Sequence, residues 1–169
     1  CDDNRKEQIE GSNPKRLIVI YNTPEDYFDI FENNIKKTRA SNNFKLGYIG
    51  LLDERRGLKS IINLLKRSPD INLVIGGSGP YEDKLKKEIT GFNNIQFLGK
   101  VFPYRKTLEI LSECDTLFAV YDPSVPNHKY SSPNKLFEAM MLGKPIIVSK
   151  NTGMDKKVEK YQCGVVVNY

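Results

Sequence analysis

The sequence contains little of what metal sites, disulfide frameworks and membrane spans are made of. Its 169 residues include three cysteines, with no CxxC pair, and one histidine, His128. These counts favour neither a zinc site nor a disulfide framework, and they leave few options for histidine acid–base chemistry. The longest apolar runs, Leu17–Tyr21 and Pro145–Val148, are far shorter than the roughly 20 residues of a membrane-spanning helix. We therefore expect a globular protein of the reducing cytoplasm.

Two common nucleotide-binding motifs are also missing, although a glycine-rich turn is present. Gly76–Pro80 follows the apolar run Leu73–Ile75, as a strand-to-helix turn would. It lacks the GxGxxG spacing of dinucleotide-binding folds and the lysine of a Walker loop, which disfavours a dehydrogenase or a P-loop enzyme. Glycines permit a tight turn as readily as a close approach to a ligand or a neighbouring loop, so the residues leave these roles open.

Positive charge is in modest excess. The chain has 26 Lys and Arg against 21 Asp and Glu, a net charge of +5. This suits an anionic partner such as a phosphate-bearing ligand, nucleic acid or a membrane surface, and it selects none of them. Because 39% of the residues are hydrophobic and 28% charged, the composition indicates a folded domain with a real core rather than disorder.

Short apolar runs alternate with helical patterns from Phe44 onward. Strands are expected at Leu46–Leu52, Leu73–Ile75, Ile95–Leu98, Thr116–Tyr121, Ile146–Ser149 and Val165–Val167, with an earlier one at Leu17–Tyr21. Helices are expected at Leu58–Leu65, Tyr81–Ile89, about 104–113 and 133–142. Strand–helix alternation predicts an α/β fold: a Rossmann-like open parallel sheet with helices on both faces.

The chain divides into two parts of different character. Residues 1–43 form a polar segment with one predicted strand, and residues 44–169 hold the regular alternation. The sequence begins Cys-Asp-Asp-Asn without an initiator methionine, so we interpret it as an internal segment. We also expect residues 44–169 to be truncated at the carboxyl end.

The first charged loop follows the strand predicted at Leu46–Leu52. In such sheets, ligands bind at the carboxyl ends of the strands. The loop Gly50–Gly57 carries Arg55 and Arg56, and a guanidinium group there could hold a diphosphate with two parallel hydrogen bonds. The alternative is a solvated turn in which both arginines pair with the acidic residues that precede them.

The densest pattern of polar residues in an apolar setting lies at 130–145. Glu138 sits in a helical segment that is otherwise apolar, and a buried carboxylate needs a partner. A ribose diol would satisfy it, and so would an internal arginine. Several groups lie at the start of this helix, where a phosphate would be stabilised: Ser131, Ser132 and the N–H groups near Asn134 and Lys135.

Several short motifs, each weak alone, occur in a specific order from Arg16 to Tyr169. They are Val19–Asn22, Gly50–Gly57, Gly77–Pro80, Ile95–Gly99, Cys114–Asp115, Leu136–Met140 with Gly143–Pro145, and Cys163–Val167. In this combination the sequence resembles the carboxyl-terminal, donor-binding domain of group 1 (family 4) glycosyltransferases with the GT-B fold. The Ser132–Glu138 window resembles a subgroup that builds polysaccharides and surface glycans. On this resemblance, residues 1–43 come from the interdomain boundary and 44–169 form the donor domain.

The resemblance implies roles for particular residues. Glu138 would bind the ribose hydroxyls of a nucleotide sugar, and Arg56 would contact its diphosphate with help from Lys135. The segment Val101–Tyr104 would lie against the base, where ordinary core packing is the alternative. The implied nucleotide-binding residues are Glu138, Arg56, Lys135, Ser132, Asn134, Leu136, Gly50, Arg55, Val101, Phe102 and Tyr104. Tyr130 and Ser131 would lie near the sugar, and no catalytic residue is assigned.

Two positions depart from the family pattern. The family commonly has a glutamate eight positions before the ribose-binding one, where it contacts the transferred sugar, and this chain has Tyr130 there. The family's arginine directly after the first loop glycine is Leu51 here, which removes one phosphate contact. The positive charge is then left to Arg55, Arg56 or Lys135.

The activity that the resemblance implies is hexosyl transfer from a nucleoside diphosphate sugar, with a UDP-sugar favoured, to a glycan, lipid or other acceptor. The reaction would retain the anomeric configuration and need no metal or other cofactor. In such enzymes an amino-terminal domain supplies the acceptor site. We expect that domain to be this chain's missing partner, so that the fragment is inactive alone. The full-length protein could associate with the inner membrane face, and nucleic acid is not an expected partner.

Two other functions compete with this one. The first is a nucleotide-sugar epimerase of the same fold, against which the Ser132–Glu138 window favours the transferase. The second is a noncatalytic module that binds polyanions through its lysines, which are Lys84, Lys86, Lys87, Lys156, Lys157 and Lys160. Those lysines are more simply interpreted as solvated helix faces, and no RNA-binding motif with interleaved aromatics accompanies them.

Overall fold

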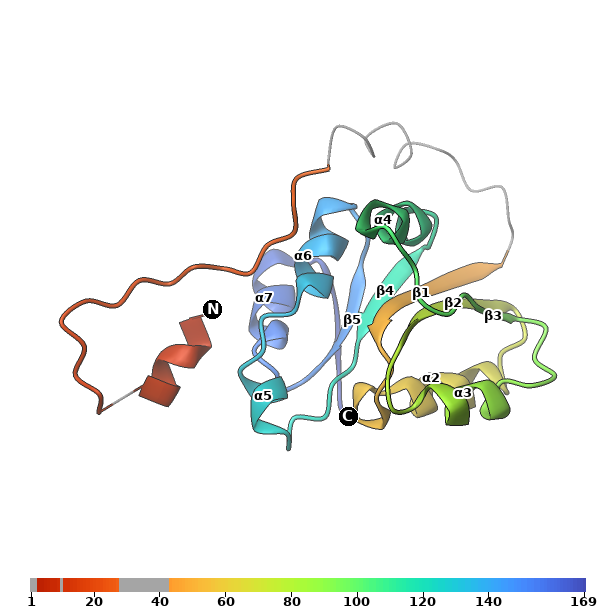
Figure 1. Cartoon of the computed structure of the whole chain (residues 1–169), viewed down its shortest axis with the longest axis horizontal. Helices are drawn as coiled ribbons and strands as arrows, with labels where there is room; N and C mark the ends of the chain where they lie inside the picture. The colour runs from red at the N-terminus through yellow and green to blue at the C-terminus, as the bar shows by residue number, and fades with distance from the viewer. Residues whose placement is uncertain (1–2, 10, 28–42) are drawn as a thin grey trace.

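In the residues that the structure describes, six parallel strands form one sheet (Figure 1). The computed structural model describes residues 3–9, 11–27 and 43–169. The strands are β1 (Phe44–Leu51), β2 (Ile71–Ser78), β3 (Ile95–Phe97), β4 (Thr116–Ala119), β5 (Ile146–Ser149) and β6 (Gly164–Val167). Their order is β3-β2-β1-β4-β5-β6, and each neighbouring pair is parallel. This doubly wound order, which reverses between β1 and β4, confirms the predicted Rossmann-like fold.

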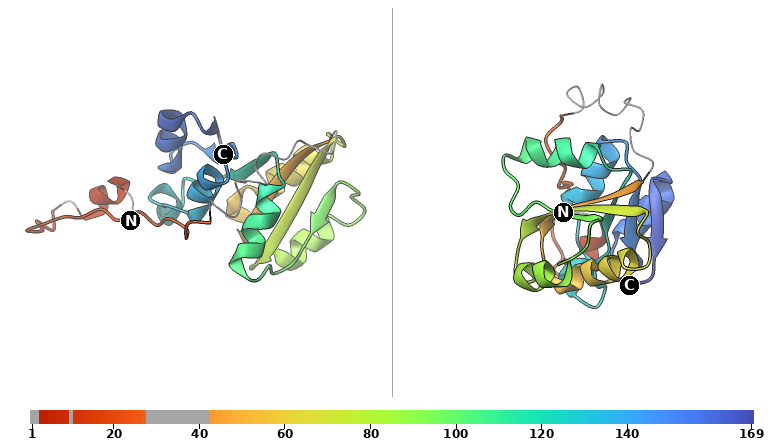
Figure 2. Two further views of the ribbon diagram at one scale, coloured as in Figure 1. Left: turned by 90° about the horizontal axis from the view of Figure 1, so that it is seen from above. Right: turned by 90° about the vertical axis from the view of Figure 1, so that its right-hand side faces the viewer.

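Helices cover both faces of the sheet. The helices of the described residues are η1 (Asp3–Ile9), η2 (Glu54–Arg56), α2 (Leu58–Leu65), α3 (Glu82–Glu88), α4 (Tyr104–Ser112), α5 (Pro126–Lys129), α6 (Asn134–Met141) and α7 (Met154–Tyr161), and η1 stands apart from the sheet (Figure 1). Residues of α2 and Leu85 of α3 pack on one face, and residues of α4, α6 and α7 pack on the other. Figure 2 shows, in its right-hand view, α4 on one side of the sheet and α2 and α3 on the other.

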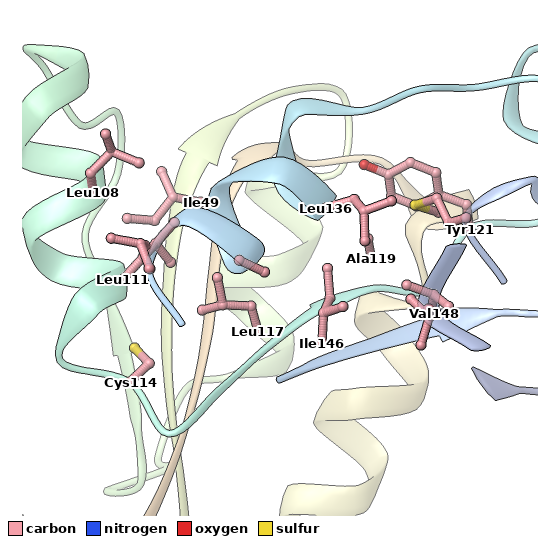
Figure 3. Packing of buried hydrophobic residues seen from close by; sticks show 14 of the residues in the cluster. Ile49, Leu108, Leu111, Cys114, Leu117, Ala119, Tyr121, Leu136, Ile146 and Val148 are labelled. Atoms are coloured by element: carbon pink, nitrogen blue, oxygen red, sulfur yellow. The ribbon is translucent and has the colours of Figure 1, made fainter. Parts of the chain in front are cut away.

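Successive strand residues point into two separate cores. In β1, Tyr48 packs with the residues of α2 and α3, whereas Ile49 packs with those of α4 and α6. In β4, Phe118 and Leu117 divide in the same way. Figure 3 shows the second of these cores, with Leu117 among residues from α4, α6 and β5. Because both faces are covered, the middle of β1, β2, β4 and β5 is apolar on both sides, which is why short continuous apolar runs predicted these strands.

The glycine-rich segment spans the end of β2 and the turn after it, and it lies against the end of β1 and the residue that follows. A Cβ atom on Gly77, whose φ is +125°, would lie 1.7 Å from the carbonyl oxygen of Gly50. A Cβ on Gly79 would lie 2.3 Å from the carbonyl oxygen of Leu52. Gly77 therefore allows the paired ends of β1 and β2 to come close, and Gly79 allows the turn after β2 to pack against the residue that follows β1, which is the neighbouring-loop role left open by the sequence.

One predicted strand is wrong. Residues 17–21 form no strand in the structure, and the side chains of Ile18 and Ile20 are 63% and 72% exposed. A β-branched apolar run has high strand propensity, but a strand also needs a neighbour with which to exchange backbone hydrogen bonds. Here the run lies outside the sheet, and the ring of Tyr21 lies against Phe137 of α6, with centroids 6.2 Å apart.

The remaining predicted elements match the structure to within a few residues. Three short elements, η1, η2 and α5, lie where no helix was predicted. The lysines interpreted as solvated helix faces lie in α3 (Lys84, Lys86 and Lys87) and in α7 (Lys156, Lys157 and Lys160). Within the described ranges, no helix has both the length and the apolar character that crossing a bilayer requires.

Candidate functional site

A pocket of about 460 Å³ opens at the carboxyl ends of β1 and β2. This is the edge of the sheet where doubly wound folds bind ligands, close to the reversal of strand order between β1 and β4. We call it the first pocket. Four segments line it: the end of β1, the end of β2, the β3–α4 connection with α4, and α6. The lining residues are Ile49, Gly50, Leu51, Gly77, Ser78, Lys100, Val101, Tyr104, Thr107, Lys135 and Glu138.

Glu138 is a buried carboxylate in the wall of the first pocket. It lies within α6, is 5% exposed, and accepts a hydrogen bond of 2.8 Å at Oε1 from the Tyr104 hydroxyl. No arginine of the described ranges forms an ion pair with it. The internal-arginine alternative is therefore wrong for those ranges, and a neutral hydroxyl is the recorded partner. A carboxylate offers about four acceptor positions, so most of its hydrogen-bonding capacity stays available.

Lys135 brings a positive charge to the end of β1. Its Nζ donates a hydrogen bond to the carbonyl oxygen of Ile49 and lies 4.6 Å from the centroid of the Tyr48 ring. A Cβ on Gly50 would lie 2.5 Å from this nitrogen, so the glycine leaves the space that the ammonium occupies. Burial lowers the pKa of Lys135 to about 8, while the charge of Glu138 raises it and that of Arg56 lowers it.

This placement bears on the family arginine that the sequence replaces. Leu51 lines the first pocket with an apolar side chain where the family pattern has a guanidinium. The ammonium of Lys135 lies beside the preceding residue, Gly50, and reaches it from α6. The chain thus supplies a cation at the end of β1 from a different element.

Arg56 and its neighbour Arg55 lie in different surroundings. The guanidinium carbon of Arg56 lies 4.2 Å from the centroid of the buried Tyr121 ring, which in turn packs against His128. The Nε atom of Arg56 is buried and has no hydrogen-bond partner in the described part of the chain. Arg56 does not line the first pocket, although its charge acts on Lys135.

Arg55 instead forms the internal pair that was the alternative interpretation. Its Nε and Nη2 atoms donate to the two carboxylate oxygens of Asp53, at 3.1 and 3.2 Å. Asp53 also caps η2 by accepting a hydrogen bond from the Arg55 backbone N–H. These contacts with Arg55 lower the pKa of Asp53. Arg55 does not line the first pocket, and of the two arginines Arg56 is the one with a buried donor that has no partner in the described residues.

The start of α6 also holds polar atoms without partners. Ser132 Oγ and Asn134 Oδ1 are buried, and neither has a hydrogen bond within the described residues. Pro133 precedes the helix without a side-chain cap, so the first N–H groups of α6 are not capped by a side chain. Buried polar atoms are nearly always hydrogen-bonded in folded proteins, and a bound polar ligand is one way to satisfy these.

The predicted base-contacting loop is divided by the structure. Val101 and Tyr104 line the first pocket, as does the neighbouring Lys100. Phe102 does not, and its side chain is 84% exposed. Leu136 was also predicted to contact nucleotide, but its side chain lies in the core between α6 and the sheet (Figure 3). Leu136 is apolar and lies four residues before Met140, so the two side chains share one face of the helix, as core-packing residues do.

Tyr130 and Ser131, the predicted sugar contacts, also lie away from the first pocket. Ser131 Oγ donates to the carbonyl oxygen of His128 at 2.9 Å. Tyr130 borders a second pocket of about 480 Å³ near the ends of β4 and β5. We call this the second pocket, and its lining residues are Glu7, Pro123, Ser124, Lys129, Tyr130, Asn151, Gly153, Asp155 and Lys156.

Some lining residues of the first pocket were not predicted. Thr107 lies three residues after Tyr104 on the same helix, so helical spacing could have found it once Tyr104 was chosen. Ser78 lies within the glycine-rich turn that had been noted. Among the described residues, no cluster of three or more His, Cys, Asp or Glu side chains could hold a metal ion.

Comparison with protein families gives one match. The model of the family described as glycosyl transferases group 1 matches residues 29–168. No curated protein sequence matches the chain.

Solved structures with the same fold include three that are informative. HepE from Anabaena, in complex with UDP and glucose, has a TM-score of 0.67 at 23% identity, over 89% of this chain and 43% of its own. TarM from S. aureus has a TM-score of 0.63 at 16% identity, over 99% of this chain and 32% of its own. The C-terminal domain of LpcC, a group 1 family protein from Francisella tularensis, has a TM-score of 0.59 at 18% identity, over 89% of this chain and 77% of its own. The chain thus spans less than half the length of HepE and TarM.

Proposed function

The chain belongs to the group 1 glycosyl transferases, as the sequence resemblance implied, and we propose that its first pocket binds the nucleotide of a nucleoside diphosphate sugar. The observation that carries this proposal is the buried carboxylate of Glu138, which faces a pocket and has a hydroxyl rather than a cation as its recorded partner. Vicinal ribose hydroxyls are donors that match its free acceptor positions.

The diphosphate is placed by the positive groups around the start of α6. Lys135 supplies an ammonium beside Gly50, and Arg56 supplies a guanidinium whose Nε lacks a partner in the described residues. The uncapped N–H groups of α6 and the hydroxyl of Ser132 add hydrogen-bond donors. Together these groups stabilise the negative charge that grows on the departing diphosphate, without a metal ion.

The reaction we propose is glycosyl transfer with retention at the anomeric carbon. The bond from that carbon to the diphosphate oxygen breaks, and a bond to an acceptor hydroxyl oxygen forms while the hydroxyl loses its proton. UDP is the favoured nucleotide because HepE and TarM, which share this fold, have been crystallised with it. We propose a hexose as the sugar and a polysaccharide or surface glycan as the product.

The acceptor site belongs, in this proposal, to a further domain. HepE and TarM are more than twice as long as the part of them that this chain matches. Residues 1–43 then come from the boundary with that domain, and residues 44–169 are the donor half. The chain alone binds nucleotide and transfers no sugar.

Calorimetric titration of the 169-residue chain with UDP, GDP and ADP tests the proposal. We expect one nucleotide to bind in the micromolar to millimolar range. Arg56→Ala should weaken that nucleotide about tenfold, since a hydrogen-bonded charged contact contributes about 1.5 kcal/mol or more. Arg55→Ala is the matched control, because Arg55 pairs with Asp53, and it should change the affinity by less than about twofold.

Two results would contradict the proposal. One is the absence of binding by all three nucleotides to a chain whose circular dichroism shows it to be folded. The other is salt-sensitive binding to a polyanion such as heparin with no competition from any nucleotide, which would favour the basic-module alternative.

A further inference from the structure

Tyr104 is the one described residue whose side chain directly contacts the buried Glu138 through a hydrogen bond. Its hydroxyl donates to Glu138 Oε1 at 2.8 Å. Tyr104 begins α4, directly after the connection that carries Lys100 and Val101 into the first pocket. The same side chain therefore touches the candidate ribose-binding group and belongs to the wall predicted to meet the base.

A glutamate carboxylate has little orientation of its own. Its terminal torsion is broad rather than confined to three staggered positions, so a neighbouring group must fix the plane of the two oxygens. In the described residues, that group is the Tyr104 hydroxyl. With Oε1 held by this bond, Oε2 is the oxygen without a recorded partner.

We propose that Tyr104 is a positioning residue that orients the Glu138 carboxylate for the ribose diol and thereby sets the preference for ribose over 2′-deoxyribose. This inference rests on the proposed nucleotide-binding function. It goes beyond the predicted role of Tyr104, which was contact of its ring with the base, because it gives the hydroxyl the separate role of orienting Glu138.

The surroundings of Tyr104 suit a fixed hydrogen-bond donor. Burial, the hydrogen bond to Glu138 and the charge of Glu138 all raise the pKa of the Tyr104 hydroxyl. The hydroxyl therefore keeps its proton across the physiological range and can only donate to an ionised Glu138. The ring is also supported, since the Tyr27 ring lies at a centroid distance of 6.3 Å and Thr107 is buried one turn further along α4.

The test compares ribonucleotide and 2′-deoxyribonucleotide binding in Tyr104→Phe. The probes are whichever of UDP, GDP and ADP binds the wild-type chain most tightly and its 2′-deoxy analogue, both measured by calorimetry. Wild type should bind the ribonucleotide more tightly. Tyr104→Phe keeps the ring and removes the hydroxyl, so the ribonucleotide should bind about fivefold more weakly while the deoxy analogue changes by less than about twofold.

The matched control is Tyr81→Phe. Tyr81 also donates its hydroxyl to a glutamate, Glu88, but neither residue lines the first pocket. This variant should leave the affinities for both probes unchanged. A second comparison uses Glu138→Gln alone and combined with Tyr104→Phe. If the hydroxyl acts through the carboxylate, the double variant should bind the ribonucleotide no more weakly than Glu138→Gln.

Each other outcome overturns the inference in a recognisable way. An unchanged ratio of the two affinities in Tyr104→Phe, or an equal loss for both probes, would mean that Tyr104 serves only packing or base contact, and the proposed function would stand. If wild type binds the ribonucleotide and its 2′-deoxy analogue equally well, this inference also fails and the proposed function stands. If the folded wild-type chain binds neither, the proposed function fails and this inference fails with it.

Discussion

The two pockets at the carboxyl edge of the sheet have nearly the same size and very different internal bonding. Their volumes are about 460 and 480 Å³. In the second pocket, Asp155 accepts hydrogen bonds from the backbone N–H groups of Asn151 and Lys156, at 2.7 and 3.0 Å. In and beside the first, the buried Glu138 has one recorded hydroxyl partner, and Arg56 Nε has none in the described chain.

This difference identifies the candidate site better than pocket volume does. A polar side chain that is already hydrogen-bonded to the backbone of the chain contributes to folding and needs no ligand as a partner. A buried polar group that lacks partners weakens the folded state unless something else satisfies it. The first pocket therefore has the character of a binding site, and the second has the character of a well-bonded loop junction.

The largest expected effect comes from removing one carboxylate in each pocket. Glu138→Ala should weaken nucleotide binding about 30-fold, because two hydrogen bonds to a charged group are lost, with little loss of thermal stability. Asp155→Ala should do the reverse: nucleotide affinity stays within about twofold, and the chain unfolds at a lower temperature, since two backbone N–H groups lose their acceptor. Calorimetry and thermal unfolding on the same samples measure both. Equal effects of the two variants on affinity would contradict the conclusion that only the first pocket is a binding site.

A second, smaller effect is the pH dependence that Lys135 gives to the first pocket. Its pKa in the free protein is lowered to about 8, and a bound diphosphate should raise it. Nucleotide binding then takes up a proton as the pH passes through 8, so affinity should be full near pH 7, about twofold lower at pH 8 and up to about tenfold lower at pH 9. Calorimetry at several pH values measures this fall, and Lys135→Met should bind more weakly but with a flat profile.

Protein stability should move in the opposite direction over the same range. The unfolded chain holds the Lys135 proton up to its ordinary pKa of 10.5, whereas the folded chain releases it near 8. Because the unfolded state binds more protons between these values, stability should rise with pH in this window as far as Lys135 is concerned. Denaturant unfolding of wild type and Lys135→Met at pH 7.5 and 9 isolates this contribution. The same slope in both proteins would show that Lys135 does not titrate there.

The smallest expected effect concerns the support beneath Arg56. Tyr121→Leu keeps an apolar core side chain but removes the ring over which the guanidinium lies, so nucleotide affinity should fall about threefold, in line with a cation–π contact of about 0.5–1 kcal/mol. Phe118→Leu is the matched control, because Phe118 is equally buried and packs with Tyr48 in the other core. If both variants lower affinity alike, general loosening of the sheet explains the loss.

The fold was largely predictable because its signals are local. Strands such as Ile146–Ser149 are short apolar runs between turn residues, and helices such as Leu58–Leu65 show one apolar stripe. The predicted strand at Leu17–Tyr21 failed because its apolar run has the right local propensity, while strand formation depends on joining a sheet, and this run lies outside the six-stranded sheet of the described residues.

The candidate site was predictable in part. Glu138 could be found because a carboxylate among apolar residues breaks the helical pattern. The different roles of Arg55 and Arg56 could not, because the sequence presents them as equivalent neighbours. Arg55 lies close enough to Asp53 to pair with it, whereas Arg56 lies over the ring of Tyr121, two residues beyond β4. The Tyr104 partner of Glu138 likewise depends on how α4 packs against α6.

One face of α6 lines the first pocket and the other packs in the core, and this limits how its sequence can change over evolutionary time. Lys135 and Glu138 are three residues apart and line the first pocket, while Leu136 and Ala139, also three apart, lie in the core. Inserting or deleting one residue would rotate everything beyond it by about 100°, sending a charge into the core and an apolar side chain into the pocket at one stroke. Residues of α6 can therefore be substituted, but the helix cannot gain or lose a residue. In homologues that keep the pocket, we expect the spacing of pocket-facing and core-facing positions in α6 to be conserved more strongly than the residues themselves.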